Sequence, residues 1–556
     1  MPPLRRVWLV FALLASAVGL AAQNAPAPPA PTPSTEAPPT SADLLRGEYG
    51  RYRANNDLLS YRLNVRVDPA SKSITGTNTI RFRMLSDDTR IQLELHPDLA
   101  VDRILLDTTP LKYQRKLGVV YVDFPMMLRS GRTYSIDFSY SGKPLEQGRF
   151  GGMAFRTDPA GRPWITTAAE DEGASSWWPC KDQWRDEPEG MQISVAVPNN
   201  LMDVSNGKFV GKTDLGDGYT RWDWLVQYPI NSYGVALNIA AYVHYAEQLG
   251  SLPLDYYVLP ENLERARAQF AQAKPMIEIF QRYFGEYPFA KDGFKLVEVP
   301  YLGMEHQSAV AYGNNFANGY LGRDFTGVGI STQFDFIIIH ESAHEWFGNA
   351  VSAADVSDMW IHEGWGTYLE ALYVEQRFGR EAALKYVNGE KVKVKNQDPV
   401  ITQRGIHRSP TQDMYFKGAL FLNTLRSVVD DVTHDDARWE KLIRDFYQRF
   451  KYQTIMTEDV VAFFNAQLGR NLTPIFDQYL RRAALPTLEL AFNEPGVLTY
   501  RWKADERAFA MPVRIGTGGK WQVIEPTTAW KTMPTSLTKD NVEVATDLYY
   551  INVNKQ

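Results

Sequence analysis

The periodicity of apolar residues changes twice along this chain of 556 residues, and each change constrains the fold. From about Tyr49 to Tyr245, apolar and polar residues alternate in short runs such as YRLNVRV and NTIRFRM, separated by Gly, Asp, Asn and Pro. Alternation with a period of two is typical of strands that bury one face. The first third of the chain therefore predicts an all-β domain.

The middle of the chain has the longer periodicity of helices. After Pro253 come segments such as ENLERARAQFAQAKPMIEIFQRYFG, with one predicted strand, FKLVEVP, from Phe294 to Pro300. From Pro486 the sequence returns to alternating segments such as LTYRW and AMPVRIG, which favour a small β-sandwich. We therefore expect a multidomain α+β protein with three folded parts: an N-terminal β domain at 47–250, a mostly helical domain at 251–485 and a C-terminal β-sandwich domain at 486–556.

The first 46 residues do not have the pattern of a folded domain. Two arginines precede an apolar run from Val7 to Leu20 that ends in small residues, which is the layout of a secretory signal, so we expect a signal peptide at 1–22. An uncleaved anchor is the alternative, but the run is short for a bilayer span of about 20 residues. The Pro- and Ala-rich stretch that follows predicts an extended linker at 23–46. We expect an exported protein, periplasmic or secreted, with no stable membrane insertion after signal cleavage.

Charge and cysteine content argue against two kinds of protein, a nucleic-acid-binding protein and one stabilised by disulfides. The formal net charge is −6 and no long run of Lys or Arg occurs, so nucleic acid is not an expected partner. Cys180 is the only cysteine, so the chain has no internal disulfide. Any metal site must therefore use histidines and carboxylates.

The strongest chemical signal is the segment His340-Glu341-Ser342-Ala343-His344, which follows the apolar run FDFIII. On a helix, residues four positions apart lie on one face, so both imidazoles can hold one zinc ion. The glutamate beside the first histidine is then placed to act as a general base rather than as a ligand. The alternative is a buried helix whose histidines are only hydrogen-bonded.

A catalytic zinc site takes three protein ligands, so a third must come from another segment. Glu363 is the leading candidate. It lies in DMWIHEGWGTYLEALYVEQRFG, where apolar residues recur at helical spacing and leave the glutamate off the apolar stripe. A second helix would thus bring its carboxylate to the two histidines.

The segment HESAHEWFGN followed by WIHEG resembles the aminopeptidase N and leukotriene hydrolase family of gluzincins, known as family M1. The resemblance continues through TTAAEDEGASSWWPCKDQW, PYLGMEHQSAVAYGN, YFKGAL and TEDVVAFFNAQLGRNLTPIFDQYLRRAALP, in the same order. It implies a thermolysin-like, mostly helical zinc catalytic domain and one zinc ion per chain.

The resemblance also implies how a substrate is held. Glu305, in Gly303-Met304-Glu305, matches the carboxylate that binds the α-amine of the substrate in this family. A second anchoring acid lies ten positions before the cysteine of the Trp-Pro-Cys segment, and counting back from Cys180 gives Glu170. The implied partners are peptides with a free N-terminus.

The reaction implied by the resemblance is removal of the N-terminal residue from peptides. Tyr415, in YFKG, matches the tyrosine that donates a hydrogen bond to the oxyanion of the tetrahedral intermediate. The expected enzyme is a zinc metalloaminopeptidase with a zinc-activated water and Glu341 as general base. The oligomeric state is left open.

Several positions depart from the family pattern and bear on side-chain preference. His306 and Gln307 follow the amine-binding glutamate where asparagine is usual, Ala168 replaces a glutamine, and His362 replaces an asparagine. Two other functions stay open: another zinc hydrolase, either an endopeptidase or an epoxide hydrolase, and a non-catalytic peptide-binding scaffold.

Overall fold

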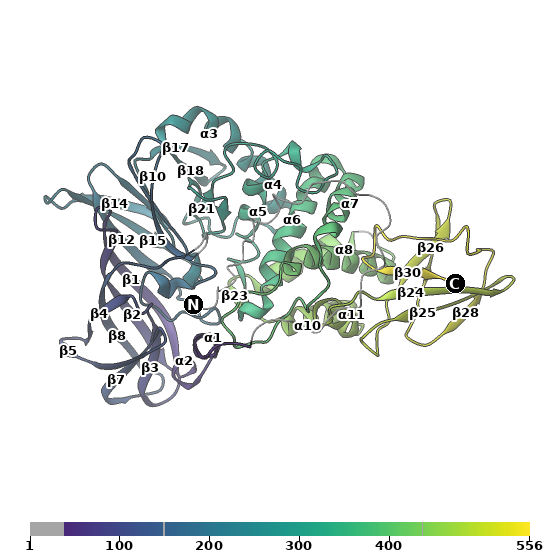
Figure 1. The fold of residues 1–556 in the computed structure, drawn as a ribbon, viewed down its shortest axis with the longest axis horizontal. Helices are drawn as coiled ribbons and strands as arrows, with labels where there is room; N and C mark the ends of the chain where they lie inside the picture. Colours follow the sequence, from purple (N-terminus) through teal and green to yellow (C-terminus); the bar gives the residue numbers. More distant parts are fainter. Residues whose placement is uncertain (1–37, 148–150, 436) are drawn as a thin grey trace, which may run out of the picture.

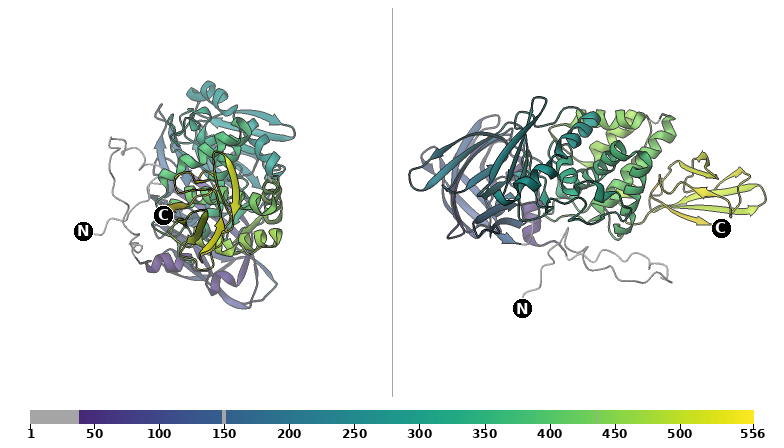
Figure 2. Two further views of the ribbon diagram at one scale, coloured as in Figure 1. Left: turned by 90° about the vertical axis from the view of Figure 1, so that its right-hand side faces the viewer. Right: turned by 90° about the horizontal axis from the view of Figure 1, so that it is seen from above.

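The computed structural model describes residues 38–147, 151–435 and 437–556, which form an elongated molecule (Figure 1). N-terminal strands, central helices and C-terminal strands follow one another along its long axis, and two further views show the same order (Figure 2). This confirms the predicted multidomain α+β fold. The predicted signal peptide at 1–22 and most of the predicted linker at 23–46 lie outside the described residues. Within the described part, no helix has the length and apolar character needed to cross a membrane.

The last residues of the predicted linker form helix α1 (Ser41–Gly47). Thr40 and Asp43 cap its first turn reciprocally through their side chains, which supplies hydrogen bonds that a helix start otherwise lacks. The backbone N–H of His407 donates to the carbonyl of Asp43 at 3.0 Å. Regular structure therefore begins a few residues before the predicted end of the linker, because local caps and a distant loop hold this turn.

The N-terminal strands form three sheets, with strand orders β14-β15-β12-β1-β2-β8-β4-β5, β3-β7-β6 and β13-β16-β11-β10-β9. The runs YRLNVRV and NTIRFRM lie in β1 and β2, which pair antiparallel with Tyr61 opposite Ile80. The short helix α2 precedes them. The elements are α2 (Arg51–Ala54), β1 (Asn56–Asp68), β2 (Ser73–Met84), β3 (Asp88–Glu94), β4 (Leu99–Leu106), β5 (Thr109–Pro110), β6 (Lys112–Lys116), β7 (Val119–Leu128), β8 (Thr133–Gly142), β9 (Glu146–Gln147), β10 (Gly151–Thr157), β11 (Pro163–Ala168), β12 (Met191–Pro198), β13 (Met202–Ser205), β14 (Lys208–Asp214), β15 (Tyr219–Val226) and β16 (Leu237–Ala240).

A five-stranded sheet of order β17-β18-β19-β21-β20 leads into the helical region. The predicted strand FKLVEVP is β19, which runs parallel to β18 and β21. The predicted domain boundary at 250 falls between β17 and β18, the two strands of one hairpin. The strands are β17 (Val243–Leu249), β18 (Leu252–Val258), β19 (Phe294–Glu298), β20 (Gly303–Met304) and β21 (Val310–Tyr312).

The helices of the central region lie between and after the strands of this sheet along the chain, and the last of them ends at residue 480. The predicted helical run at 261–285 divides into α3 and α4, and Pro275 lies in the first turn of α4, where a missing N–H is tolerated. Two short strands, β22 (Val351–Ala353) and β23 (Gln453–Ile455), pair between the helices. The helices are α3 (Leu263–Phe270), α4 (Ala273–Phe284), α5 (Phe336–Ala343), α6 (Trp360–Phe378), α7 (Arg380–Gly389), α8 (Asp413–Thr433), α9 (Arg438–Phe450), α10 (Thr457–Leu468) and α11 (Thr473–Leu480).

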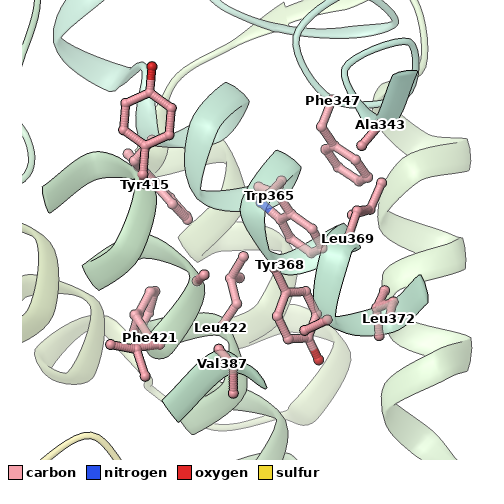
Figure 3. Packing of buried hydrophobic residues seen from close by; sticks show 14 of the residues in the cluster. Ala343, Phe347, Trp365, Tyr368, Leu369, Leu372, Val387, Tyr415, Phe421 and Leu422 are labelled. Atoms are coloured by element: carbon pink, nitrogen blue, oxygen red, sulfur yellow. The ribbon is translucent and has the colours of Figure 1, made fainter. Parts of the chain in front are cut away.

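Stacked aromatic rings fill the core of the helical region. Phe347 and Trp365 lie parallel with ring centroids 4.4 Å apart (Figure 3). Phe446 stacks on Trp365 with 5.5 Å between centroids. All three side chains are buried. Each such ring buries a large apolar area, so the loop after α5 and the helices α6 and α9 are fixed relative to one another.

Helices α6 and α8 approach each other closely at Gly364 and Gly418. A Cβ atom on Gly418 would lie 2.8 Å from the Cα of Gly364, and one on Gly364 would lie 3.1 Å from the Cα of Gly418. Only glycine allows this backbone contact.

The C-terminal strands form two sheets of order β28-β25-β24-β30 and β27-β26-β29. Their buried apolar residues belong to the same continuous cluster as the helical region, whereas the N-terminal strands have a separate cluster. Lys391 donates to the carbonyl of Thr546 at 2.7 Å across the junction. The strands are β24 (Thr487–Glu494), β25 (Val497–Lys503), β26 (Val513–Thr517), β27 (Lys520–Ile524), β28 (Lys531–Pro534), β29 (Glu543–Val544) and β30 (Asn552–Lys555).

Candidate metal centre and substrate site

Helix α5 carries the two histidines of the motif. Asp335 caps its N-terminus by accepting hydrogen bonds from the backbone N–H groups of residues 337 and 338, which fixes where the helix begins. His340 lies near the end of the helix and His344 is its C-cap, still in right-handed helical geometry. Both imidazoles are buried, 3% and 1% exposed.

Three ligand atoms converge as the sequence predicted. The Nε2 atoms of His340 and His344 lie 3.4 Å apart, and Oε2 of Glu363, from the first turn of α6, lies 3.5 and 3.4 Å from them. Ligands about 2.0–2.1 Å from a tetrahedral zinc ion lie roughly 3.4 Å from each other. The spacing therefore fits zinc.

The hydrogen bonds of the outer ring nitrogens determine where the imidazole protons lie. Nδ1 of His340 contacts Oε1 of Glu370 at 2.7 Å, and Nδ1 of His344 contacts the carbonyl of Phe347 at 2.9 Å. Both partners only accept, so each Nδ1 carries a proton and each Nε2 faces Glu363. Burial opposes but Glu363 raises the pKa of both rings, and loss of the second proton from each ring leaves two lone pairs and a carboxylate that can hold a cation.

Glu341 lies against β20, and its side chain is 3% exposed. A Cβ atom on Gly303 would lie 2.7 Å from Oε1 of Glu341, so the glycine allows the strand to pass directly over the carboxylate. Burial raises the pKa of Glu341 to about 8, an effect that His340 opposes. A base with a raised pKa accepts a proton near neutral pH.

Glu170 and Glu305 form the acidic pair of the site. Oxygens of these two carboxylates and of Glu363 all lie within 4.8 Å of one another. Burial raises the pKa of Glu170 well above its usual value, reinforced by the charges of Glu305 and Glu363. Burial also raises the pKa of Glu305, which the charge of His344 opposes. Three carboxyl groups thus lie together beside the two histidines.

Tyr415 is the third residue of α8, and its ring stacks loosely on that of His340 with centroids 6.1 Å apart. Figure 3 shows its hydroxyl pointing away from the apolar side chains of the helical core. Tyr415 and Glu170 line one small cavity. The other lining residues are Asp171, Met359, Ser409, Pro410, Gln412 and Met414. The tyrosine and the acidic pair therefore face the same space.

Met304 and His306 have no polar role in this arrangement. The side chain of Met304 is 2% exposed within the apolar cluster. The ring of His306 is fully buried, neither nitrogen has a hydrogen-bond partner among the described residues, and burial lowers its pKa to about 3. His306 is not among the ligand groups that converge in the described part of the chain.

Glu370 and Tyr386 support the metal ligands but were not predicted. Oε1 of Glu370 fixes the ring of His340, and its Oε2 accepts a hydrogen bond from the hydroxyl of Tyr386. Glu370 follows Glu363 by seven residues, two helical turns, so the spacing along α6 could have indicated it. No local pattern indicates Tyr386, which comes from α7.

The three convergent ligands form a zinc-binding centre with the His-Glu-x-x-His arrangement. The family model "Peptidase family M1 domain" matches residues 268–479, and "Peptidase M1 N-terminal domain" matches residues 58–233. The chain belongs to peptidase family M1.

Relatives in this family are distant in sequence. The chain is 20% identical over 542 residues to a puromycin-sensitive aminopeptidase of Caenorhabditis elegans, covering 87% of this chain and 54% of that protein. It is 21% identical over 493 residues to a probable aminopeptidase of Sulfurisphaera tokodaii, covering 84% of this chain and 60% of that protein. The chain thus spans little more than half the length of these relatives.

A solved structure has the same fold. The M1 zinc metallopeptidase of Deinococcus radiodurans superposes with a TM-score of 0.62 at 21% identity, covering 78% of this chain and 94% of that one. A mutant of that enzyme was solved with a bound Tyr-Ser-Ala substrate.

Proposed function

We propose that the protein is a zinc-dependent aminopeptidase that hydrolyses the first peptide bond of peptides with a free N-terminus. The acidic pair carries this proposal. Glu170 and Glu305 place carboxylate oxygens within 4.8 Å of Glu363, which is itself engaged with two histidines. Two buried carboxylates beside a metal ligand are stable as charges only with a cation, and an α-ammonium group is that cation in a peptide.

The catalytic chemistry is divided between the metal and Glu341. A zinc ion held by His340, His344 and Glu363 supplies Lewis-acid polarisation and lowers the pKa of water to about 7. Glu341 takes the proton of the attacking water and later passes it to the leaving amine. Gly303 keeps this carboxylate in place because no side chain separates the strand from it.

Tyr415 stabilises the negative charge that develops on the carbonyl oxygen. Burial, reinforced by the charge of Glu363, raises the pKa of its hydroxyl well above 10, so the group stays protonated and donates a hydrogen bond. One such donor is worth about 10²- to 10³-fold in rate. Tyr415 and Glu170 line one cavity, which supports a donor and an amine anchor that act on the same substrate residue.

Restriction to the first bond follows from charge. Internal peptide units carry no ammonium group, so they would leave Glu170 and Glu305 buried without a counterion. Breaking a buried charge pair costs roughly 3–5 kcal/mol, which is enough to exclude internal cleavage.

The test is cleavage of a panel of aminoacyl anilides beside their N-acetylated forms, with and without a zinc chelator. Chelator-sensitive cleavage of the free-amine set alone is expected. Cleavage of acetylated substrates at similar rates would contradict the role of the acidic pair and favour a different zinc hydrolase. No cleavage together with no bound zinc would favour a peptide-binding scaffold.

Export is part of the proposal. The basic start, apolar run and small residues of segment 1–22 support a cleaved signal and a periplasmic or secreted enzyme. Mass spectrometry of the protein from cell fractions tests this, because a mature N-terminus near Ala22 in the exported fraction is expected. An intact Met1 in the cytoplasmic fraction would contradict it.

A further inference from the structure

A buried chain of hydrogen bonds runs from β22 to the amine anchor Glu305. The backbone N–H of Ala353 donates to Nε2 of His362 at 2.8 Å, and Nδ1 of the same ring lies 3.3 Å from the hydroxyl of Tyr233. That hydroxyl donates to Oε1 of Glu305 at 2.9 Å. His362, Tyr233 and Glu305 are 0%, 1% and 3% exposed, so water does not compete for these contacts.

The direction of every proton in this chain is determined. The N–H of Ala353 can only donate, so Nε2 of His362 carries a lone pair. A neutral imidazole then has its proton on Nδ1, which donates to the oxygen of Tyr233. The tyrosine's own proton is left for Glu305. All three donors thus point toward the carboxylate.

We propose that His362 and Tyr233 are positioning residues that hold Glu305 in place as the anchor for the substrate's α-ammonium group, an inference that rests on the proposed aminopeptidase function. A carboxylate with both oxygens free to rotate would have to be ordered by the substrate itself. The hydrogen bonds fix Oε1 of Glu305 before the substrate binds, so binding energy from the amine is not spent on ordering this side chain.

The same hydrogen bonds also connect the metal ligands to the amine anchor. His362 immediately precedes Glu363 on α6, and its ring is tied to β22 through Ala353. On the other side of Glu305, its backbone carbonyl accepts a hydrogen bond from the side chain of Asn349 at 2.8 Å. The distance between the amine anchor and the third metal ligand is therefore set by one hydrogen-bonded unit.

A packing role is the alternative explanation for these residues. The ring of His362 stacks on Trp184 with centroids 5.0 Å apart and planes 3° apart, and Tyr233 stacks on the same indole at 4.9 Å. Stacking needs only the rings, whereas positioning needs the ring nitrogens and the hydroxyl. Substitutions can separate the two.

Tyr233→Phe removes the hydroxyl and keeps the stacked ring. For the best free-amine anilide of the panel, we expect KM to rise roughly 10- to 100-fold, as for a lost hydrogen bond to a charged group, with a smaller change in kcat. Zinc content should equal that of the wild type. Tyr242→Phe is the matched control, because it removes a buried hydroxyl that donates to the carbonyl of Glu298. We expect its KM to stay within about twofold of wild type.

Two substitutions at His362 test the donor at Nδ1. His362→Asn places an amide donor at that position without an aromatic ring, and His362→Phe keeps a ring for stacking without any nitrogen. We expect the asparagine variant to retain a KM within about tenfold of the wild type and the phenylalanine variant to resemble Tyr233→Phe. The reverse order would show that stacking, not positioning, is the role, and would overturn the inference.

The outcomes distinguish this inference from the proposed function. If the wild type cleaves free-amine substrates and Tyr233→Phe has an unchanged KM, the positioning role is wrong while the aminopeptidase stands. If the wild type cleaves acetylated substrates equally well, the amine anchor and the inference both fail. If Tyr233→Phe does not fold, the KM order of the two His362 variants decides.

Discussion

The metal ligands and the acidic pair lie side by side, but they differ in the hydrogen-bond partners that the protein gives them. Each histidine ligand has an outer partner, Glu370 or the carbonyl of Phe347, and Glu363 faces both rings. Among the described residues, the carboxylate of Glu305 accepts a hydrogen bond from the hydroxyl of Tyr233, while Oε1 of Glu170 and Oε2 of Glu363 are buried without a hydrogen-bond partner. The protein thus fixes both imidazoles of the metal half, and it leaves Oε1 of Glu170 in the acidic half and Oε2 of Glu363 for bound groups to satisfy.

This difference assigns separate tasks to the two halves. Buried polar groups without partners are costly, and a bound ligand can supply the missing partner. In the proposed aminopeptidase, the metal half would stay constant during turnover and the acidic half would be completed by the ammonium group of each substrate. Substitutions can separate the two halves.

The largest expected effect comes from Glu341→Gln, which removes the base and leaves both halves intact. General-base catalysis contributes about 10²- to 10⁴-fold, so kcat should fall by that factor. Zinc content by elemental analysis and affinity for a free-amine peptide by calorimetry should both stay near wild type. Near-normal turnover would mean that another group takes the proton.

Glu305→Gln is expected to damage only the acidic half. Loss of a buried charge partner costs roughly 3–5 kcal/mol, so kcat/KM for free-amine anilides should fall about 10²- to 10³-fold. The slow rate on acetylated anilides should not fall, which shrinks the selectivity ratio. A fall in bound zinc of similar size would show that the halves are not separable.

Glu370→Gln is expected to damage only the metal half. Substitution of a group that orients a metal ligand typically weakens metal binding about 10- to 100-fold, which competition with a chelator measures. With zinc in excess, KM for free-amine substrates should be unchanged. Glu375→Gln is the matched control on the same helix, because its carboxylate pairs with Arg426 rather than with a ligand. Equal loss of zinc in both variants would contradict the role of Glu370.

The smallest effect concerns Asp171, which lines the cavity beside Glu170. Burial raises its pKa from 3.8 to about 6, so the folded state holds a proton that the unfolded chain has released at pH 4–6. The stability contributed by this proton is present below pH 4 and is lost as the pH rises through 6. Asp171→Asn should therefore raise the free energy of unfolding relative to wild type increasingly from pH 4 to 6 and by a constant amount above, at most about 3 kcal/mol, which Tm measured across this pH range follows. A difference in Tm that is flat across this range would contradict the shift.

The sequence alone predicted the parts of the molecule that depend on local periodicity. The alternating runs of β1 and β2 and the helical spacing of α6 follow from burial of one face, and the four-residue spacing of His340 and His344 follows from one helix turn. The third ligand could be predicted because Glu363 lies off an apolar stripe.

Long-range contacts could not be predicted in this way. Tyr233 and His362 meet across 129 positions of sequence, and no spacing rule joins them. His362 stood out only as a departure from a family pattern, without a contact to explain it. The division of the run at 261–285 was missed for another reason: apolar periodicity continues across the break between α3 and α4.

The contact between Gly364 and Gly418 has a consequence for how the enzyme can vary. Gly364 follows the third metal ligand, and Gly418 follows Tyr415 by three residues, so the spacing of these two helices also sets the distance between that ligand and the proposed oxyanion donor. A single added methyl group at either position would move the donor relative to the metal without touching a substrate. Two residues without a side chain thus set the distance between the metal ligand and Tyr415, and a side chain at either position would widen it.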